Sequence, residues 1–204
     1  MYQIMTADEA MDLINDGDVI ALNSFLGIDI PIELHEALYK RYQRTGSPKH
    51  LTAISSAGFG AWDENKAAEG YIRDGAVDKI ICGHFGAMYS TKKLVLEDRF
   101  EAYNLPLGCI SHAIRAQAGG LPGALSKVGL DIFVDPRLED RESTTYQRMT
   151  HLLNTSSWTV RNSSTTSCRL STWLSSRELL PTARATSHLR ICLPQEMRCP
   201  SVRL

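Results

Sequence analysis

The last 75 residues of this 204-residue sequence contain no glycine, although the residues before them contain 14. Residues 141–204 also lack lysine and aspartate, and they combine 21 Ser+Thr with nine Arg. Because glycine supplies the left-handed positions of tight turns, a segment without it forms the turns of a compact fold with difficulty. The composition therefore divides the chain after residue 139, and we expect an irregular, poorly ordered tail over 140–204.

Three further absences concern location. No apolar run approaches the roughly 18 residues of a membrane-spanning helix, so we expect no membrane partner. The N-terminal segment is acidic and lacks the basic and apolar regions of a secretory signal. The five cysteines show no Cys-x-x-Cys spacing and no grouped histidines. These features predict a cytoplasmic protein with free thiols and no metal site.

Charge is distributed unevenly along the chain. Residues 1–140 carry 13 Lys+Arg against 20 Asp+Glu, whereas residues 141–204 carry nine Arg against three Glu. A basic tail of this kind can bind nucleic acid, because phosphate counterions are released on binding. This tail has no lysine and no aromatic residues interleaved within a basic patch, so we expect no nucleic-acid partner.

Local patterns predict two helices near the N-terminus. Thr6 and Glu9 have the spacing of a capping box, and the apolar residues that follow predict a helix. A second helix is expected to begin after Pro31 and to stop at Gly46, with leucines on one face. Residues 64–78 are most simply an exposed helix with its C-cap.

Short apolar runs followed by glycine turns predict the strands of a sheet. These runs occupy residues 19–22, 50–58, 77–87 and 127–136. Alternation of such strands with helices predicts an α/β fold over residues 1–139, with an open, largely parallel sheet flanked by helices. Ligands bind such sheets at the carboxyl ends of the strands. The expected site loops are Asn23–Gly27, Ser55–Gly60, Cys82–Ala87 and Asn104–Gly108.

Two Cys–His pairs offer an alternative chemistry. Cys82 with His84, and Cys109 with His112, fall at expected strand-to-turn junctions, where a thiol nucleophile and a base could meet. No residue near either pair is placed to orient the histidine, so packing is the favoured interpretation. The glycine loops contain neither a GxGxxG pattern nor a P-loop lysine, so phosphate binding has little support.

Three stretches resemble the family I coenzyme A transferases, the group of the propionate/acetate and acyl-CoA:3-ketoacid enzymes. They are "DGDVIALNSFLGIDIP" (16–31), "VDKIICGHFGA" (77–87) and "AYNLPLGCISHAIRAQAGGLPGALSKVGLDIFVDPR" (102–137). The third is the most specific, because its Asn, Pro, Gly, His, Arg and terminal Asp-Pro-Arg occur in the order found in that family. The resemblance spans about residues 3–139.

The resemblance implies CoA transfer between a short-chain acyl-CoA and a small carboxylate such as acetate. In this family a glutamate attacks the thioester, giving an acyl-glutamyl anhydride and then a glutamyl-CoA thioester, which the acceptor carboxylate resolves. Coenzyme A enters as a substrate, and no bound cofactor is expected. The glutamate lies in a second half or on a β subunit, and the parent enzyme is expected to be a homo-oligomer. No residue of this sequence matches the glutamate motif, so the chain alone is expected to be inactive.

The residues that the resemblance assigns to substrate and CoA binding are Asn23, Ser24, Phe25, Gly27, Gly83, Leu107 and Gly108. Asn23 and Ser24 stand where the family often has Gly-Gly or Ser-Gly, and a serine restricts positive φ. Leu107 stands where many members have Gln, which removes a side-chain amide from the acyl pocket.

The tail is expected to be translated in the wrong reading frame from about residue 140. Joining the last base of each codon to the first two of the next converts Trp158 and Thr159 into an aspartate codon. Residues 155–165 can then spell Glu-Leu-Val-Asp-Gly-Glu-Glu-Phe-Leu-Tyr, which resembles the family's continuation. A shifted frame also explains the missing glycine, because out-of-frame GGN codons encode other residues.

Three interpretations remain open. The first is a frame-disrupted N-terminal half of a family I enzyme, and the second is an α-subunit-like partner of a separate catalytic chain. The third is a non-enzymatic α/β domain that binds a small acyl or phosphorylated ligand.

Overall fold

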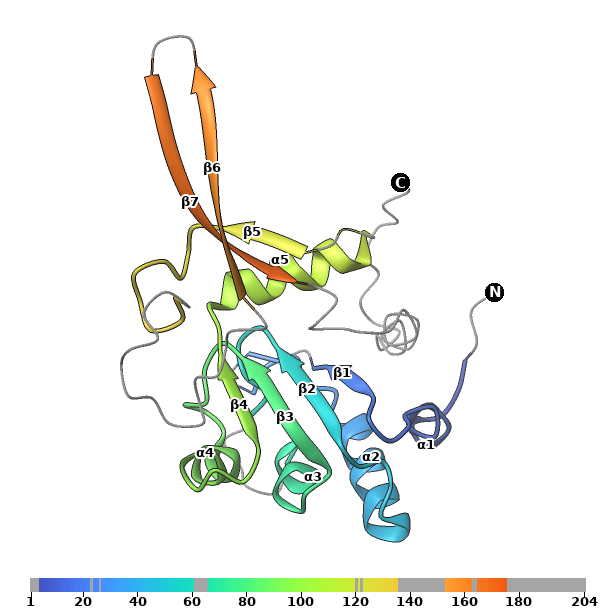
Figure 1. Cartoon of the computed structure of the whole chain (residues 1–204). Coiled ribbons are helices and arrows are strands. Elements are labelled where there is room, and N and C mark those ends of the chain that lie inside the picture. Colours follow the sequence, from blue (N-terminus) through green and yellow to red (C-terminus); the bar gives the residue numbers. More distant parts are fainter. Residues whose placement is uncertain are drawn as a thin grey trace.

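Figure 1 shows the computed structural model of the chain. It describes residues 4–22, 24–25, 27–60, 66–119, 121 and 123–135, with the backbone alone for 153–162 and 165–175. Four parallel strands form a sheet in the order β1-β2-β3-β4. They are β1 (Val19–Ala21), β2 (Leu51–Ser55), β3 (Val77–Cys82) and β4 (Glu101–Asn104). The predicted α/β fold with a parallel sheet flanked by helices is confirmed.

Helices cover both faces of this sheet. They are α1 (Ala7–Met11), α2 (Ile32–Thr45), α3 (Glu69–Arg73), α4 (Tyr89–Leu96) and α5 (Leu107–Ala118). Since connections between parallel strands are right-handed, strands in sequential order place α2, α3 and α4 on one face. Ala53 and Ile80 pack with residues of these helices, whereas Ile54 and Ile81 pack with α5. Successive residues of a strand therefore face opposite layers, which explains why the strands are apolar throughout.

The first two helices form as the sequence predicts. The Thr6 side chain accepts a hydrogen bond from the Glu9 amide, and the Glu9 carboxylate accepts from the Thr6 amide at 2.8 Å, which completes the capping box. The bond from the Thr6 amide, and after it one of 2.9 Å from the Thr6 hydroxyl to the same carboxylate, lower the pKa of Glu9. Helix α2 ends at Gly46, whose φ of 70° is the left-handed conformation that glycine adopts without strain.

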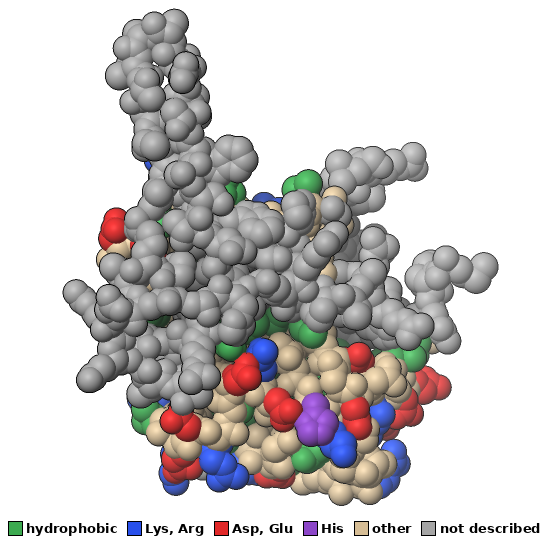
Figure 2. Space-filling model, in the orientation of Figure 1, with side chains coloured by type: hydrophobic (Ala, Val, Ile, Leu, Met, Phe, Trp, Pro, Cys, Tyr) green, Lys and Arg blue, Asp and Glu red, His purple; other side chains and the backbone are tan. Residues whose placement is uncertain are grey.

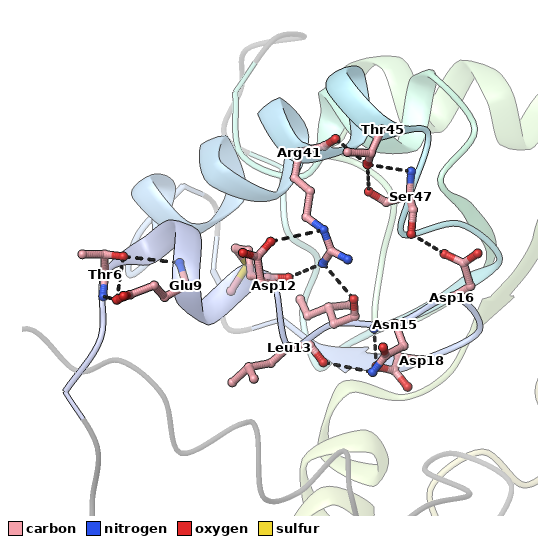
Figure 3. A network of polar contacts seen from close by, with 12 residues as sticks. Thr6, Glu9, Asp12, Leu13, Asn15, Asp16, Asp18, Arg41, Thr45 and Ser47 are labelled. Atoms are coloured by element: carbon pink, nitrogen blue, oxygen red, sulfur yellow. Dashed lines mark hydrogen bonds and ion pairs between the residues drawn. The ribbon is translucent and has the colours of Figure 1, made fainter.

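A polar network holds α1 against α2 (Figure 3). The Arg41 guanidinium donates to the carbonyl oxygens of Met11 and Ile14, with 2.8 Å to the latter, and its Nε lies 3.5 Å from the Asp12 carboxylate. Met11 is the last residue of α1 and Ile14 lies in the segment that follows, so Arg41 of α2 ties the end of α1 and this segment to α2.

The loops that precede β1 and β2 are tied together in the same region (Figure 3). The Asp16 carboxylate accepts from the Ser47 hydroxyl at 2.7 Å and from the Lys49 amide at 3.0 Å. These two bonds, that from Ser47 first, lower the pKa of Asp16. The Asp16 carboxylate at the amino ends of β1 and β2 therefore has a structural role, because it holds the two loops together.

The expectation of an exposed helix over 64–78 is wrong. Helix α3 spans only Glu69–Arg73, and four of its residues are buried. The Glu69 carboxylate is 1% exposed and accepts from the Thr91 amide at 2.9 Å and the Thr91 hydroxyl at 3.0 Å. It thereby caps the first turn of α4, a location that favours negative charge.

The expected strand over 127–136 is also wrong, because the described residues 127–135 form turns. Gly129 has a φ of 103° and Asp131 a φ of 61°, and both values interrupt an extended strand. The Asp131 amide instead donates to the Asp135 carboxylate at 2.7 Å, which closes a turn. The fourth strand of the sheet is β4, earlier in the chain.

A second, antiparallel sheet has the order β5-β7-β6 and comprises β5 (Gly123–Ser126), β6 (Leu153–Asn162) and β7 (Thr165–Ser175). Strands β6 and β7 pair along their length and extend away from the parallel sheet in Figure 1. Within the predicted tail over 140–204 these two stretches are extended backbone, and the rest of the predicted tail lies outside the described residues. Their content of Thr, Val and Trp favours extended backbone even without glycine.

The surface differs between the two ends of the parallel sheet. Near the amino ends of the strands, Lys and Arg are interspersed with Asp and Glu, whereas hydrophobic side chains emerge toward α5 (Figure 2). Exposed large hydrophobic residues on that side are Leu107, Leu121, Leu125, Val128, Ile132 and Phe133. Within the described part of the chain, no helix is long and apolar enough to cross a membrane.

Candidate functional site

The loops that follow the four parallel strands lie at one edge of the sheet, on the side of α5 (Figure 1). Strands β1 and β4 are the outermost strands of the sheet. The loop after β1 and the first turn of α5, which follows β4, therefore lie at opposite ends of the row of loops. The loops after β2 and β3 lie between them. The predicted site loops therefore share one edge of the sheet, as expected for ligand binding in an open α/β fold.

Gly83 joins the loops after β2, β3 and β4. A Cβ on Gly83 would overlap the carbonyl oxygen of Ser56 and would lie 3.2 Å from the Cβ of Leu107. The Leu105 amide also donates to the Cys82 carbonyl at 3.0 Å. Gly83 is thus required for the close approach of three backbone segments, two of which carry predicted site residues.

The loops after β2 and β3 also meet at a second place. The His84 amide donates to the Ala57 carbonyl at 2.9 Å. A Cβ on Gly58, whose φ is 146°, would lie 2.7 Å from the carbonyl oxygen of His84. Because backbone atoms line these contacts, the glycines of "SSAGFG" and "CGHFGA" fix the arrangement of the edge.

The loop after β1 carries the first group of predicted residues. Asn23 lies outside the described residues. Ser24 is buried at 6% exposure, and its hydroxyl has no hydrogen-bond partner among the described residues. Phe25 is half exposed and pairs with Ile28 through two backbone hydrogen bonds of 3.1 and 2.9 Å. Gly27 lies inside that turn with a φ of 86°, which glycine alone adopts readily.

Ser24 is accommodated without strain. Among the described non-glycine residues, positive φ occurs at Asp29, His50, Ala67, Asp98 and Asp131, and Ser24 is not one of them. A serine can therefore stand where the family resemblance leads us to expect glycine, because the backbone there does not enter the left-handed region.

Helix α5 begins directly after Pro106, so Leu107 and Gly108 form its first turn. The first amides of a helix have no intrahelical acceptor, and nothing lies within 4 Å of a Cβ placed on Gly108. Cys109 and His112 lie in this helix, so their predicted place at a strand-to-turn junction is wrong. Cys109 is a buried residue of the core beneath α5.

The Cys82 thiol is unsuited to nucleophilic attack. Its side chain is fully buried, burial raises the pKa of the thiol, and its Sγ contacts the carbonyl oxygen of His84 at 3.4 Å. A thiolate is the reactive form, so a raised pKa suppresses reactivity at neutral pH. The preference for packing over a Cys–His catalytic pair is therefore supported for Cys82.

The described residues of the predicted site loops, 24–25, 27, 55–60, 82–87 and 104–108, include hydrogen-bond donors but no Asp, Glu, Lys or Arg, whereas Asp29 and Lys66 follow farther along the loops after β1 and β2. In the part of the chain that the structure describes, no three His, Cys, Asp or Glu side chains gather as metal ligands. Backbone amides, the serine hydroxyls of these loops and the His84 imidazole can bind and orient an oxygen atom of a ligand.

The model of the family described as "Coenzyme A transferase" matches residues 4–161. This match covers the parallel sheet, all five helices and the loops described above. The chain belongs to the coenzyme A transferase family.

Relatives include both single-chain and two-subunit members of the family. The chain is 32% identical to "Acetate CoA-transferase YdiF" of Escherichia coli K12 over 135 residues, which are 66% of this chain and 25% of that protein. It is 32% identical over 139 residues to "Caffeate CoA-transferase" of Acetobacterium woodii, covering 68% and 26%. It is 28% identical over 152 residues to "Acetate CoA-transferase subunit alpha" of E. coli K12, covering 74% and 64%.

Solved structures agree with the sequence relatives. The apoenzyme of the acyl-CoA transferase YdiF from E. coli O157:H7 matches with a TM-score of 0.69 and 25% identity, over 85% of this chain and 32% of that chain. A thioester complex of the same protein with CoA matches with a TM-score of 0.68. The chain therefore spans about a quarter of the length of the single-chain relatives YdiF and caffeate CoA-transferase.

Sequence reasoning missed two features of this edge. The start of helix α5 at Leu107 has a sequence signal, because Pro106 is followed by apolar residues at helical spacing, including Ile110 and Ile114. The contact between Gly83 and the Ser56 carbonyl had no local signal, because it depends on how two loops meet in space.

Proposed function

We propose that this chain supplies the N-terminal half of an acyl-CoA:carboxylate CoA-transferase. The substrates are a short-chain acyl-CoA and a small carboxylate such as acetate, and coenzyme A enters as a substrate with no bound cofactor. The observation that carries this proposal is the 32% identity with acetate CoA-transferase YdiF. The aligned sheet presents its glycine-rich loops together at one edge, which supports a common pocket.

The pocket residues are proposed from the family resemblance. Ser24, Phe25 and Gly27, together with the undescribed Asn23, form its wall after β1, and Gly83, Leu107 and Gly108 form its wall after β3 and β4. The first-turn amides of α5 carry the partial positive charge of the helix N-terminus and can stabilise a developing oxyanion. Leu107 is 42% exposed, which supports an apolar contact with the acyl chain.

The glutamate nucleophile is proposed to come from a second half of the fold, supplied by a restored reading frame or by a partner chain. The absence of Asp, Glu, Lys and Arg from the described segments 82–87 and 104–108 is consistent with this arrangement. The apolar surface beside α5 supports it as well, because Leu121, Leu125, Val128, Ile132 and Phe133 are between 45% and 60% exposed. Exposed apolar surface of this kind commonly marks an interface.

The test is a transferase assay with acetyl-CoA and propionate. The 204-residue chain alone is expected to produce no propionyl-CoA above background. A chain whose frame is restored after residue 139, and which continues through the family's second half, is expected to produce it. A restored chain with the motif glutamate changed to glutamine serves as the matched control. A folded restored chain that binds acetyl-CoA without transfer would contradict the proposal.

A second candidate is an α subunit that works with a separate β chain. The coverage of 64% of the E. coli acetate CoA-transferase α subunit favours it. Co-expression with the product of the adjacent downstream gene distinguishes the two, since only a true α subunit would acquire activity without any change of frame.

A further inference from the structure

His84 lies in the loop after β3, and its ring lies beside two glycines. A Cβ on Gly58 would lie 3.4 Å from the ring Cε1 and 3.6 Å from Nδ1, and a Cβ on Gly86 would lie 3.7 Å from Nδ1. These are ordinary contact distances, so the ring packs along the backbone of the loops after β2 and β3.

The backbone of His84 is held at both of its polar atoms. Its amide donates to the Ala57 carbonyl at 2.9 Å, and its carbonyl oxygen accepts from the Cys82 Sγ at 3.4 Å. These contacts join the loops after β2 and β3, so the position of the ring is set by the edge of the sheet.

The imidazole has no polar partner of its own in the described part of the chain. Two of the three other described histidines differ in this respect: His35 is bonded to the Tyr71 hydroxyl and His50 to the Asp78 carboxylate, while His112 lies on the exposed side of α5. The His84 residue is half-buried, so it is held by the loops and is still partly open to solvent. A side chain with free hydrogen-bonding capacity in that situation can bind a ligand or an ordered water.

The neighbours of His84 indicate what that ligand is. The adjacent Gly83 contacts the position of Leu107, which lies in the acyl pocket proposed above. No Asp, Glu, Lys or Arg lies in segments 82–87 and 104–108, so the neighbouring residues of these two loops bring no charge to the imidazole. A neutral imidazole offers one N–H donor, which suits an acyl or carboxylate oxygen.

We propose that the His84 imidazole donates a hydrogen bond to an oxygen of the substrate's acyl or carboxylate group and thereby orients it in the pocket. This inference rests on the proposed function. His84 binds and positions the substrate, and no proton transfer by it is invoked.

The test is an NMR titration of the 204-residue chain labelled with ¹³C-histidine. The His84→Gln variant assigns the His84 ring resonance by its disappearance. Acetate, coenzyme A and acetyl-CoA are added in separate titrations. We expect acetate and acetyl-CoA to shift the His84 resonance and coenzyme A alone to leave it in place. His50, at the amino end of β2, serves as the internal control and should not respond.

Calorimetry of acetyl-CoA binding supplies the second readout. His84→Ala should weaken binding about fivefold to tenfold, the loss of one hydrogen bond. His84→Gln, which keeps an N–H donor, should lose about threefold or less, and His50→Ala should bind like the unchanged chain.

Each other outcome overturns the inference. If acetyl-CoA binds while the His84 resonance stays in place and His84→Ala binds normally, the inference fails and the proposed function stands. The same holds if coenzyme A alone shifts the resonance as much as acetyl-CoA. If the folded chain binds neither acetyl-CoA nor acetate, the proposed function fails for this chain, and the inference fails with it.

Discussion

Nδ1 of His35 and the hydroxyl oxygen of Tyr71 lie 3.0 Å apart in the core, where they join the first turn of α2 to α3. The rings stack at a centroid distance of 5.9 Å, and the remaining nitrogen of His35 has no partner among the described residues. Both groups are buried, and burial raises the pKa of the Tyr71 hydroxyl and lowers that of His35 to about 4.

Stability is expected to fall as the pH drops from about 6.5 to about 4. The folded chain holds His35 neutral, whereas the unfolded chain takes up a proton near the ordinary value of 6.5. Above pH 6.5 His35 is neutral in both states and does not reduce the free energy of unfolding. As the pH falls from 6.5 toward the folded pKa, the unfolded chain is stabilised by protonation and the free energy of unfolding decreases. The decrease at pH 4.5 is expected to be roughly 2–3 kcal/mol. Urea unfolding at pH 7.5, 6.0, 5.0 and 4.5 measures it.

The control is a pair of histidine variants. His35→Phe should flatten the difference between pH 7.5 and pH 5.0, because the titrating group is gone. His50→Gln removes an exposed histidine at the surface and should leave that difference in place. Equal pH profiles for the unchanged chain and His35→Phe would rule out His35 as the source.

Gly83→Ala is expected to destabilise the fold by roughly 1–3 kcal/mol, because its methyl group would overlap the Ser56 carbonyl and backbone atoms give way poorly. Gly108→Ala is the matched control in the first turn of α5. Nothing lies within 4 Å of its Cβ, so it should be neutral or add about 0.4–1 kcal/mol. Thermal unfolding compares the two. Similar effects in both variants would show that the Gly83 contact is absent.

Arg41→Ala is expected to lower the free energy of unfolding by roughly 1–3 kcal/mol, because the carbonyls of Met11 and Ile14 lose a charged donor. Arg41→Lys should recover only part of the lost free energy of unfolding, since a single ammonium group replaces the planar guanidinium with its several N–H donors. Arg44→Ala, on the exposed side of the same helix, should stay within about 0.5 kcal/mol of the unchanged chain. Equal losses at both arginines would contradict the proposed anchoring of α1.

The parts of the fold that the sequence predicts are those whose causes are local. Thr6 with Glu9 marks the start of α1, and Gly46 marks the end of α2, because caps involve residues a few positions apart. The apolar runs of β1, β2 and β3 are recognisable since both faces of this sheet are covered.

The errors have causes that lie far away in the sequence. A glutamate in a short polar segment is expected at the surface. Glu69 is nevertheless buried, because the amide and hydroxyl of Thr91, 22 positions later in the first turn of α4, donate hydrogen bonds to its carboxylate. Residues 127–135 are apolar enough for a strand, but the left-handed backbone at Gly129 and Asp131 turns the chain. The position of His84 depends on contacts with Ala57 and Gly58 in another loop, and the sequence alone does not show that these loops meet.

The measurement that tests the central claim most directly is the nucleotide sequence of the gene from codon 135 through the next thousand or so bases. The account predicts that a single-base change near codon 140 opens a frame that continues the coenzyme A transferase family and contains its glutamate motif. In that frame, the codons of Trp158 and Thr159 would supply an aspartate. A stop codon in the shifted frame before this position, with nothing similar to the family downstream, would contradict the account. The arginine-rich tail would then be a genuine part of the protein.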